Sequence, residues 1–284
     1  MRWEGREGSS NVEDRRGMGV GRGAGLGCGG LLVVAVIALL TGADPQQLLQ
    51  LLSGAAEAPT EQAPAGPAQS QPQDQLGKFA SVVLRDTEVT WEEVFRQRNA
   101  GYQPPQLVLF EQAVRSACGL NSSAVGPFYC PLDSKVYLDL GFFNELGRRF
   151  GAPGDFAAAY VIAHEVGHHV QHVLGVGDEV QRLRQRASEA QANQLSVLME
   201  LQADCLAGVW GHYANQRQII EPGDFEEGLR AAAAIGDDRL QRMGQGYVQP
   251  ESWTHGSSEQ RVTWLRQGFS SGRIENCDTF RSRR

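Results

Sequence analysis

The sequence contains no basic run with interleaved aromatic residues, and its formal net charge is −7 with a pI near 5.4. Proteins that bind nucleic acid carry a basic surface, so the composition excludes nucleic acid as a partner. The five cysteines include no C-x₂-C pair, which argues against a zinc site built from thiolates. No internal repeat is present, and 284 residues allow one sizeable domain with appendages.

Histidine is also scarce, because only six occur, yet two of them stand in the motif H-E-x-x-H at residues 164–168. Such a motif is expected by chance on the order of once per hundred chains of this kind. Residues four apart on an α-helix face nearly the same way, so His164 and His168 can bind one tetrahedral Zn²⁺. Glu165 then lies beside the metal, where a general base for a metal-activated water belongs.

A catalytic zinc site needs a third protein ligand, and the sequence offers His172, His169 and Glu200. His172 follows His164 by eight residues, a rise of about 12 Å, which is too long for one ion with Zn–N bonds of about 2.1 Å. His169 points roughly 100° away from His168 on the same helix. We therefore expect the third ligand to be Glu200, on a second, Ala- and Leu-rich helix.

Asp204 follows Glu200 by four residues and shares its helix face. We expect the Asp204 carboxylate to accept a hydrogen bond from the outer nitrogen of a ligating histidine, which fixes the tautomer and orientation of that ring. An E-x-x-x-D pair alone is typical of a solvated helix face. Its position after H-E-x-x-H favours the metal-site interpretation.

H-E-x-x-H followed by E-x-x-x-D resembles the glutamate zincins, metallopeptidases in which two histidines and a downstream glutamate bind zinc. Further motifs make the chain similar to a bacterial neutral zinc metallopeptidase family of membrane-anchored proteins. These motifs are N-V-E-D-R-R-G at 11–17, G-P-F-Y-C-P at 126–131, Y-L-D-L at 137–140, E-L-Q-A-D-C at 200–205 and C-D-T-F at 277–280. The resemblance covers nearly the whole chain apart from about residues 44–76. It implies a zincin fold, one zinc ion per chain and peptidase activity.

The N-terminal part predicts a membrane anchor. Residues 1–22 are polar and glycine-rich, and residues 23–43 carry no charge around an apolar centre from Leu31 to Leu40. About 20 such residues span a bilayer, so a transmembrane helix is expected at 23–43. A cleaved signal peptide is the alternative, with the small residues 41–43 as its cleavage site. The leading region is long and carries both signs of charge, which favours the anchor.

The orientation of this anchor follows from its flanking charges. Arg15, Arg16 and Arg22 precede it, and no Lys or Arg follows until Lys78. The positive-inside rule then predicts a cytoplasmic N-terminus and an exported C-terminal domain. We expect a single-pass protein of a bacterial inner membrane with a periplasmic or extracellular domain.

Residues 44–76 are rich in Gln, Ala and Pro, and we expect a disordered linker there. The folded domain is predicted to span residues 77–284 and to be α+β with helix dominating. Helices are expected at 142–150, 156–174, 178–196, 199–213 and 224–243, and T-W-E-E at 90–93 predicts the start of a short helix. Residues 136–140 alternate as a strand does. They form either an ordinary sheet strand, which we prefer, or an edge strand that pairs with an extended substrate.

Four cysteines fall in the predicted exported domain, and an even number there suits two disulfides. Sequence alone allows three pairings. Cys118 and Cys130 bracket a loop containing Gly, Asn and Pro, so we expect that pair together with Cys205–Cys277. The second bridge would hold the C-terminal tail on the helix of Glu200.

The remaining step of peptide hydrolysis needs a hydrogen-bond donor for the developing oxyanion besides zinc. His255, in a turn-rich stretch, is the preferred candidate, with Tyr247 and Tyr160 as rivals. A downstream His or Tyr often has this role in glutamate zincins, so the resemblance supports the same choice.

The sequence therefore predicts a membrane-anchored zinc peptidase in which Glu165 is the general base and His255 assists. Its partners would be a peptide or protein substrate and, through one helix, the membrane. Two alternatives remain open: a non-catalytic zinc-containing envelope scaffold, and a zinc hydrolase acting on a non-peptide amide. A structural site has no need for a base beside the metal, so the presence of Glu165 favours an enzyme.

Overall fold

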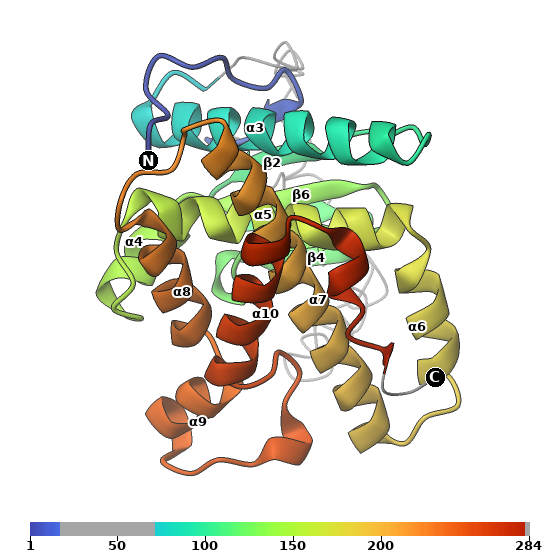
Figure 1. The fold of residues 1–284 in the computed structure, drawn as a ribbon. Coiled ribbons are helices and arrows are strands. Elements are labelled where there is room, and N and C mark those ends of the chain that lie inside the picture. Colours follow the sequence, from blue (N-terminus) through green and yellow to red (C-terminus); the bar gives the residue numbers. More distant parts are fainter. Residues whose placement is uncertain (18–71, 282–284) are drawn as a thin grey trace, which may run out of the picture. The chain divides into compact units, whose positions relative to one another are not determined.

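A four-stranded sheet brings together segments that are far apart in the sequence. The computed structural model describes residues 1–17 and 72–281 (Figure 1). The strand order is β1-β2-β6-β5, in which β5 alone runs antiparallel to its neighbour. The bounds are Val12–Asp14 for β1, Gln106–Phe110 for β2, Phe128–Cys130 for β5 and Lys135–Asp139 for β6. A separate hairpin consists of β3 (Ala113–Ser116) and β4 (Gly119–Ser122).

Helices account for most of the described residues, which confirms the expected helix-rich α+β class. They are α3 (Gln75–Gln97), α4 (Gly141–Arg148), α5 (Asp155–Val173), α6 (Val176–Arg184), α7 (Glu189–Gln216), α8 (Asp224–Ala234), α9 (Asp237–Gln245) and α10 (Ser258–Ser271). Short 3₁₀ turns lie at Ser123–Val125, Pro250–Ser252 and Ile274–Cys277. Figure 1 shows α3 across the top of the bundle, above α5 and α7.

The two predicted helices at 178–196 and 199–213 have different boundaries in the structure. The break falls at 185–188, and α7 then runs without interruption from 189 to 216. Ser188 begins α7 with a capping box, since its hydroxyl accepts from the backbone N–H of Gln191 while the Gln191 side chain accepts from the Ser188 N–H. The predicted capping box at 90–93 is wrong, because it lies inside α3. Thr90 there donates its hydroxyl to the carbonyl of Asp86.

Helices α5 and α7 pack closely enough to share a site. A side chain at Gly167 would place its Cβ 2.9 Å from the carbonyl oxygen of Ala203, so only glycine fits at this crossing. The neighbouring core is apolar and closed: Phe156 stacks on Trp210, and both rings are nearly inaccessible. Burial of such aromatic groups stabilises the helix pair.

Residues 1–17 belong to the same compact unit as the described residues after the gap. The prediction of a separate N-terminal segment at 1–22 is therefore corrected for residues 1–17, and residues 18–22 lie outside the described residues. β1 pairs with β2 so that Val12 lies opposite Leu107, and Val12 is buried because its side chain faces the core of this unit. The terminal ammonium of Met1 also donates to the Asp155 carboxylate at 2.8 Å, at the first turn of α5.

The chain enters and leaves the undescribed segment at one place on this unit. Arg16, just before the gap, forms ion pairs with Asp14 at 2.6 Å and with Asp74, just after the gap, at 2.5 Å. The Arg16 hydrogen bond outweighs desolvation and lowers the pKa of Asp74 to about 2, so this pair persists across the physiological pH range.

The predicted transmembrane helix at 23–43 and nearly all of the predicted linker at 44–76 lie outside the described residues. Within the described ranges, no helix combines the length and the apolar character that a membrane crossing requires. A single crossing between residues 17 and 72 would put β1 and β2 on opposite sides of a membrane. The predicted topology, with a cytoplasmic N-terminus and an exported domain, is thus incompatible with the pairing of these strands in one chain.

Strand β6, which contains the predicted strand residues, is an interior strand between β2 and β5. The preferred interpretation of residues 136–140 as an ordinary sheet strand is confirmed, and the edge-strand alternative is wrong. The edge of the sheet on that side is β5.

The strand pairing predicts that residues 1–17 and the helical domain lie on the same side of any membrane. Single cysteines replacing the exposed Ser10 and Gln97, in a chain with Cys28→Ser, should react equally with a membrane-impermeant maleimide in intact cells. The four disulfide-bonded cysteines do not compete for the reagent. Labelling of one position before lysis and of the other only after lysis would contradict the same-side topology.

Candidate metal centre

The structure brings His164, His168 and Glu200 together, as expected from the sequence. The Nε2 atom of His164 lies 3.1 Å from Glu200 Oε2, and the Nε2 atom of His168 lies 3.3 Å from Glu200 Oε1. The ligand atoms of all three side chains lie within 4.8 Å of one another. Two imidazole nitrogens and one carboxylate that converge in this way form a donor set that suits a catalytic zinc ion.

The outer nitrogens of both imidazoles are occupied by other partners. The Nδ1 atom of His164 lies 2.9 Å from Asp204 Oδ1, and the Nδ1 atom of His168 lies 2.8 Å from Gln171 Oε1. Each ring therefore presents Nε2 toward Glu200. This arrangement is what a metal site requires, since the outer hydrogen bond selects the tautomer whose inner nitrogen has a free lone pair.

Asp204 lies where the sequence predicts it and has further partners that the sequence did not indicate. It is fully buried and forms a two-pronged ion pair with Arg261, through Nε at 2.8 Å and Nη2 at 2.9 Å. The Tyr160 hydroxyl donates to it at 2.5 Å. Burial alone would raise the pKa of Asp204, but the charges of Arg261 and His164 outweigh it and hold the pKa at about 2. Asp204 is therefore an anion in this buried position.

The other histidines of α5 do not join the group. The imidazole of His169 is buried and spans between the Tyr129 hydroxyl, 3.0 Å from Nδ1, and the carbonyl oxygen of Gln103, 2.8 Å from Nε2. His172 lines the neighbouring cleft without approaching the ligand atoms as a fourth member. The helical geometry that separates His172 from His164 is the reason.

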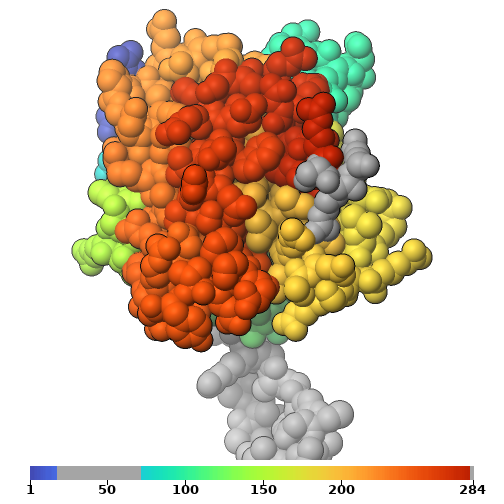
Figure 2. Space-filling model, turned by 60° about the horizontal axis from the view of Figure 1, so that its bottom comes forward, coloured from blue at the N-terminus to red at the C-terminus, as the bar shows by residue number. Residues whose placement is uncertain are grey.

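Glu165 and the three grouped side chains line a cleft of about 1200 Å³. Residues of α6 and α9 form part of its walls, and Figure 2 shows these two segments (yellow and orange-red) on either side of one face of the molecule. Glu165 is 8% exposed. Burial raises the pKa of this carboxyl above its ordinary value, while the nearby His164 and His168 act in the opposite direction.

His255 reaches the same cleft from the loop between α9 and α10. Asp237, the first residue of α9, organises this loop because its Oδ2 accepts from the backbone N–H groups of Thr254, His255 and Gly256. Asp237 Oδ1 also lies 3.1 Å from His255 Nδ1, and this hydrogen bond raises the pKa of His255. The contact leaves Nε2 as the atom for other interactions.

The two tyrosines considered beside His255 lie in different surroundings. Tyr160 is buried with its hydroxyl on Asp204, and Tyr247 is 59% exposed and does not line the cleft.

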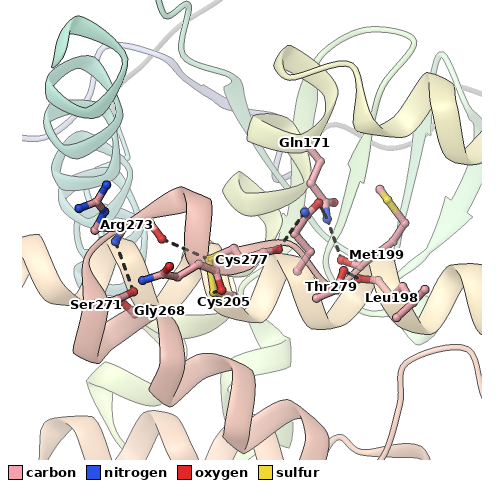
Figure 3. Close-up of a disulfide and its surroundings, with 11 residues drawn as sticks. Gln171, Leu198, Met199, Cys205, Gly268, Ser271, Arg273, Cys277 and Thr279 are labelled. Carbon is pink, nitrogen blue, oxygen red and sulfur yellow. Dashed lines mark hydrogen bonds between the residues drawn. A yellow bond between two sulfur atoms is a disulfide. The ribbon is translucent and has the colours of Figure 1, made fainter. Parts of the chain in front are cut away.

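Both predicted disulfides are confirmed. Cys118, in the turn between β3 and β4, is bonded to Cys130 of β5, with a sulfur–sulfur distance of 2.03 Å. Cys205 of α7 is bonded to Cys277, with a distance of 2.05 Å (Figure 3). The second bridge joins the C-terminal segment to the residue that directly follows Asp204.

The sequence analysis considered Tyr160 only as an oxyanion donor, and four contacts of the site escaped it: Gln171 with His168, Tyr160 with Asp204, Asp237 with His255 and Arg261 with Asp204. The first two carry a periodic signal, since Gln171 follows His168 by three residues and Tyr160 precedes His164 by four on the same helix. Asp237 and Arg261 approach the site only through the fold, and no spacing in the sequence indicates them.

The chain belongs to the family described as "Putative neutral zinc metallopeptidase", whose model matches residues 1–280. It is 48% identical over 287 residues to Uncharacterized protein YpfJ of Escherichia coli strain K12, covering 99% of both chains. It is 44% identical over 200 residues to Uncharacterized protein Rv2575 of Mycobacterium tuberculosis strain H37Rv, covering 66% of this chain and 67% of that one. No solved structure matches the chain.

The geometry predicts which side chains control metal affinity. Glu200→Gln should weaken zinc binding by more than about 100-fold, because loss of a direct ligand exceeds the 10–100-fold effect typical of outer partners. His172→Gln should leave the affinity unchanged. Competition with a chromophoric chelator measures both variants. Equal losses in the two would show that the metal is bound elsewhere in the helix α5 region.

The ion pair of Arg261 with Asp204 predicts a stability effect. Arg261→Met leaves a buried carboxylate without its counter-charge, which should lower the free energy of unfolding by about 3–5 kcal/mol. The double variant Asp204→Asn with Arg261→Met should recover part of this loss, because no uncompensated charge remains. Urea unfolding of the metal-free proteins measures these differences. The explanation by charge would be contradicted if the double variant lost more free energy of unfolding than the two single variants lose together.

Proposed function

We propose that the protein is a zinc-dependent peptidase that hydrolyses peptide bonds in the cleft beside α5. The observation that carries the proposal is Glu165 in the cleft wall next to the converging side chains of His164, His168 and Glu200. A purely structural zinc site is closed by four protein ligands and has no use for a neighbouring base. Here three ligands meet at an open cleft.

A zinc ion bound by these three residues would lower the pKa of a water molecule and polarise the carbonyl group of the substrate. Glu165 would accept the proton of the attacking water on its carboxylate. It would then donate that proton to the nitrogen of the leaving amine, which cannot depart as an anion. Burial of Glu165 favours the donation step, because a raised pKa lets the carboxyl group keep the proton until the leaving amine accepts it.

His255 would donate a hydrogen bond from Nε2 to the carbonyl oxygen as negative charge develops there. Its support is the Asp237 carboxylate, which holds Nδ1 and three backbone N–H groups of the same loop. A side chain held on both its ring and its backbone is already oriented before the substrate arrives, which lowers the cost of organising the transition state.

The substrate would bind along β5 in an extended conformation. Among the described strands, β5 pairs only with β6, and its own residues Phe128 and Tyr129 line the cleft. An unpaired strand edge can add a peptide by backbone hydrogen bonding. The cleft volume of about 1200 Å³ also exceeds the roughly 300–1,000 Å³ of small-molecule pockets, which favours a polypeptide substrate.

Residues 23–43 would attach this peptidase to a membrane, as their uncharged, apolar sequence suggests, without a single crossing that would separate β1 from β2. The β1–β2 pairing then requires residues 1–17 and the cleft to face the same compartment. The two disulfides favour an oxidising compartment.

Cleavage of a diverse peptide library by the full chain tests the proposal. Glu165→Gln should lower kcat/KM by about 10²–10⁴-fold, the range expected for loss of a general base, without loss of bound zinc. His255→Gln should lower kcat by about 10²–10³-fold, as removal of one oxyanion donor does. Wild-type and Glu165→Gln proteins that each bind one zinc ion and cleave no peptide would contradict the peptidase and favour a zinc-containing scaffold.

A further inference from the structure

A chain of amide hydrogen bonds runs from the metal ligand His168 to the C-terminal segment. Gln171 is fully buried, and its Nε2 donates to the carbonyl oxygen of Met199 at 2.7 Å and to Gln202 Oε1 at 3.0 Å. Gln202 in turn donates from Nε2 to the carbonyl oxygen of Cys277 at 3.0 Å. These contacts connect α5, α7 and the segment after α10.

The donor and acceptor of each hydrogen bond in this series follow from the last acceptor, which is the carbonyl oxygen of Cys277. A backbone carbonyl cannot donate, so the atom of Gln202 that faces Cys277 is the amide nitrogen and its oxygen faces Gln171. Gln171 must then direct its nitrogen to Gln202 and Met199, which leaves its oxygen toward His168. The hydrogen-bond pattern therefore fixes the orientation of both amides.

The consequence for His168 is a defined tautomer. Gln171 Oε1 can only accept, so the proton of the imidazole resides on Nδ1, 2.8 Å away. The lone pair of Nε2 is then free on the side of Glu200. Figure 3 shows Gln171 directed toward the carbonyl of Met199, beside the disulfide of Cys277.

The Cys205–Cys277 disulfide and the hydroxyl of Thr279 hold in place the segment at which this series of hydrogen bonds ends. Cys277 is bonded to Cys205 on α7, and Thr279 donates its hydroxyl to the carbonyl oxygen of Leu198 at 2.7 Å. Both contacts fasten the C-terminal segment to the helix that carries Glu200. The Cys277 carbonyl is thereby kept opposite Gln202.

The two ligand histidines thus differ in their support. His164 has an anion, Asp204, whereas His168 has a neutral amide that adds little electrostatic attraction for a cation. The contribution of Gln171 is therefore the orientation and tautomer of the ring. How well Gln171 orients His168 depends on how tightly the hydrogen bonds to Met199 and Gln202 restrain its own side-chain amide.

We propose that Gln171 is a positioning residue for His168 and that the Cys205–Cys277 disulfide supports metal affinity by holding the C-terminal segment against Gln202. The proposal rests on the metal site of the proposed function and does not depend on peptidase activity. Met199 and Gln202 act together on Gln171, so the loss of Gln202 alone should weaken the metal site less than the loss of Gln171.

The test measures the zinc dissociation constant of the full chain by chelator competition. Gln171→Met, which keeps the length of the side chain and removes the amide, should raise this constant about 10–100-fold. Gln202→Met should raise it by a smaller factor. Gln97→Met, on the exposed face of α3, is the matched control and should leave it unchanged. Thermal unfolding of the metal-free proteins checks that each variant is folded.

A double-mutant cycle tests whether the Cys205–Cys277 disulfide contributes to zinc affinity through Gln202. Cys205→Ser with Cys277→Ser should raise the zinc dissociation constant as Gln202→Met does, and combining all three changes should add little, because they remove the same contact. Fully additive losses would show that the disulfide acts by another route, and an unchanged constant would overturn its role.

Nitrogen-15 NMR of the histidine rings separates positioning from general destabilisation. In the metal-free wild type at a pH where His168 is neutral, its proton should be found on Nδ1, and in Gln171→Met the two tautomers should be mixed. A folded Gln171→Met protein with unchanged zinc affinity and unchanged tautomer would overturn the proposal. Should zinc affinity shift as expected while no peptide is cleaved, the positioning role stands and the peptidase function fails.

Discussion

The close approach of α5 and α7 is the constraint on which the metal centre depends. His164 and His168 lie on α5, whereas Glu200 and Asp204 lie on α7, and all four side chains are short relative to a usual helix separation of 8–10 Å. Gly167 allows the two backbones to meet, because a Cβ there would collide with the Ala203 carbonyl. A larger residue at 167 would move the carboxylates away from both imidazoles. Glycine inside this helix lowers helix propensity by about 1 kcal/mol, and that cost is offset by the shared site.

Charge balance gives a second reason for a divalent cation at this position. Glu165, Glu200 and Asp204 contribute three negative charges to a mostly buried cluster, and Arg261 contributes one positive charge, which leaves a net charge of about −2 when both histidines are neutral, as metal binding requires. Without a metal, a proton on His164 supplies part of the compensation, because against the opposing effect of burial Asp204 and Glu200 raise its pKa to about 10. Uncompensated buried charge is costly, and a Zn²⁺ ion would neutralise the cluster. Arg261 has a separate effect, since its guanidinium neutralises Asp204, the partner of His164, through a two-pronged ion pair. The carboxylate can then orient the ring without adding a further full negative charge beside the metal.

The sequence was sufficient for the parts of the site that lie within single helices. The i, i+4 spacings of His164 with His168 and of Glu200 with Asp204 are local, and the structure groups these residues as the spacing requires. Arg261 and Asp237 could not be predicted, because their partners are more than 50 and 15 residues away along the chain. The helix start predicted at Thr90 is wrong for a related reason. Residues 90–93 match the capping-box pattern, but the apolar face of α3 continues through them, and its packing outweighs the local preference for a helix start. β1 shows the same limit, since a strand of three residues is stable only through its pairing with β2 and the burial of Val12, both of which depend on distant residues.

The two disulfides illustrate how this fold stabilises a site at its surface. Neither crosses the interior of the sheet: Cys130 belongs to β5, which borders the cleft, and Cys205 directly follows Asp204. Edge strands and chain ends are the parts of a domain that open most readily, because few contacts hold them. Cys130, Cys205 and Cys277 are themselves buried, so each bridge ties a peripheral segment to well-packed structure. One bridge therefore holds the β5 edge beside the cleft, and the other holds the C-terminal segment that supports Gln202.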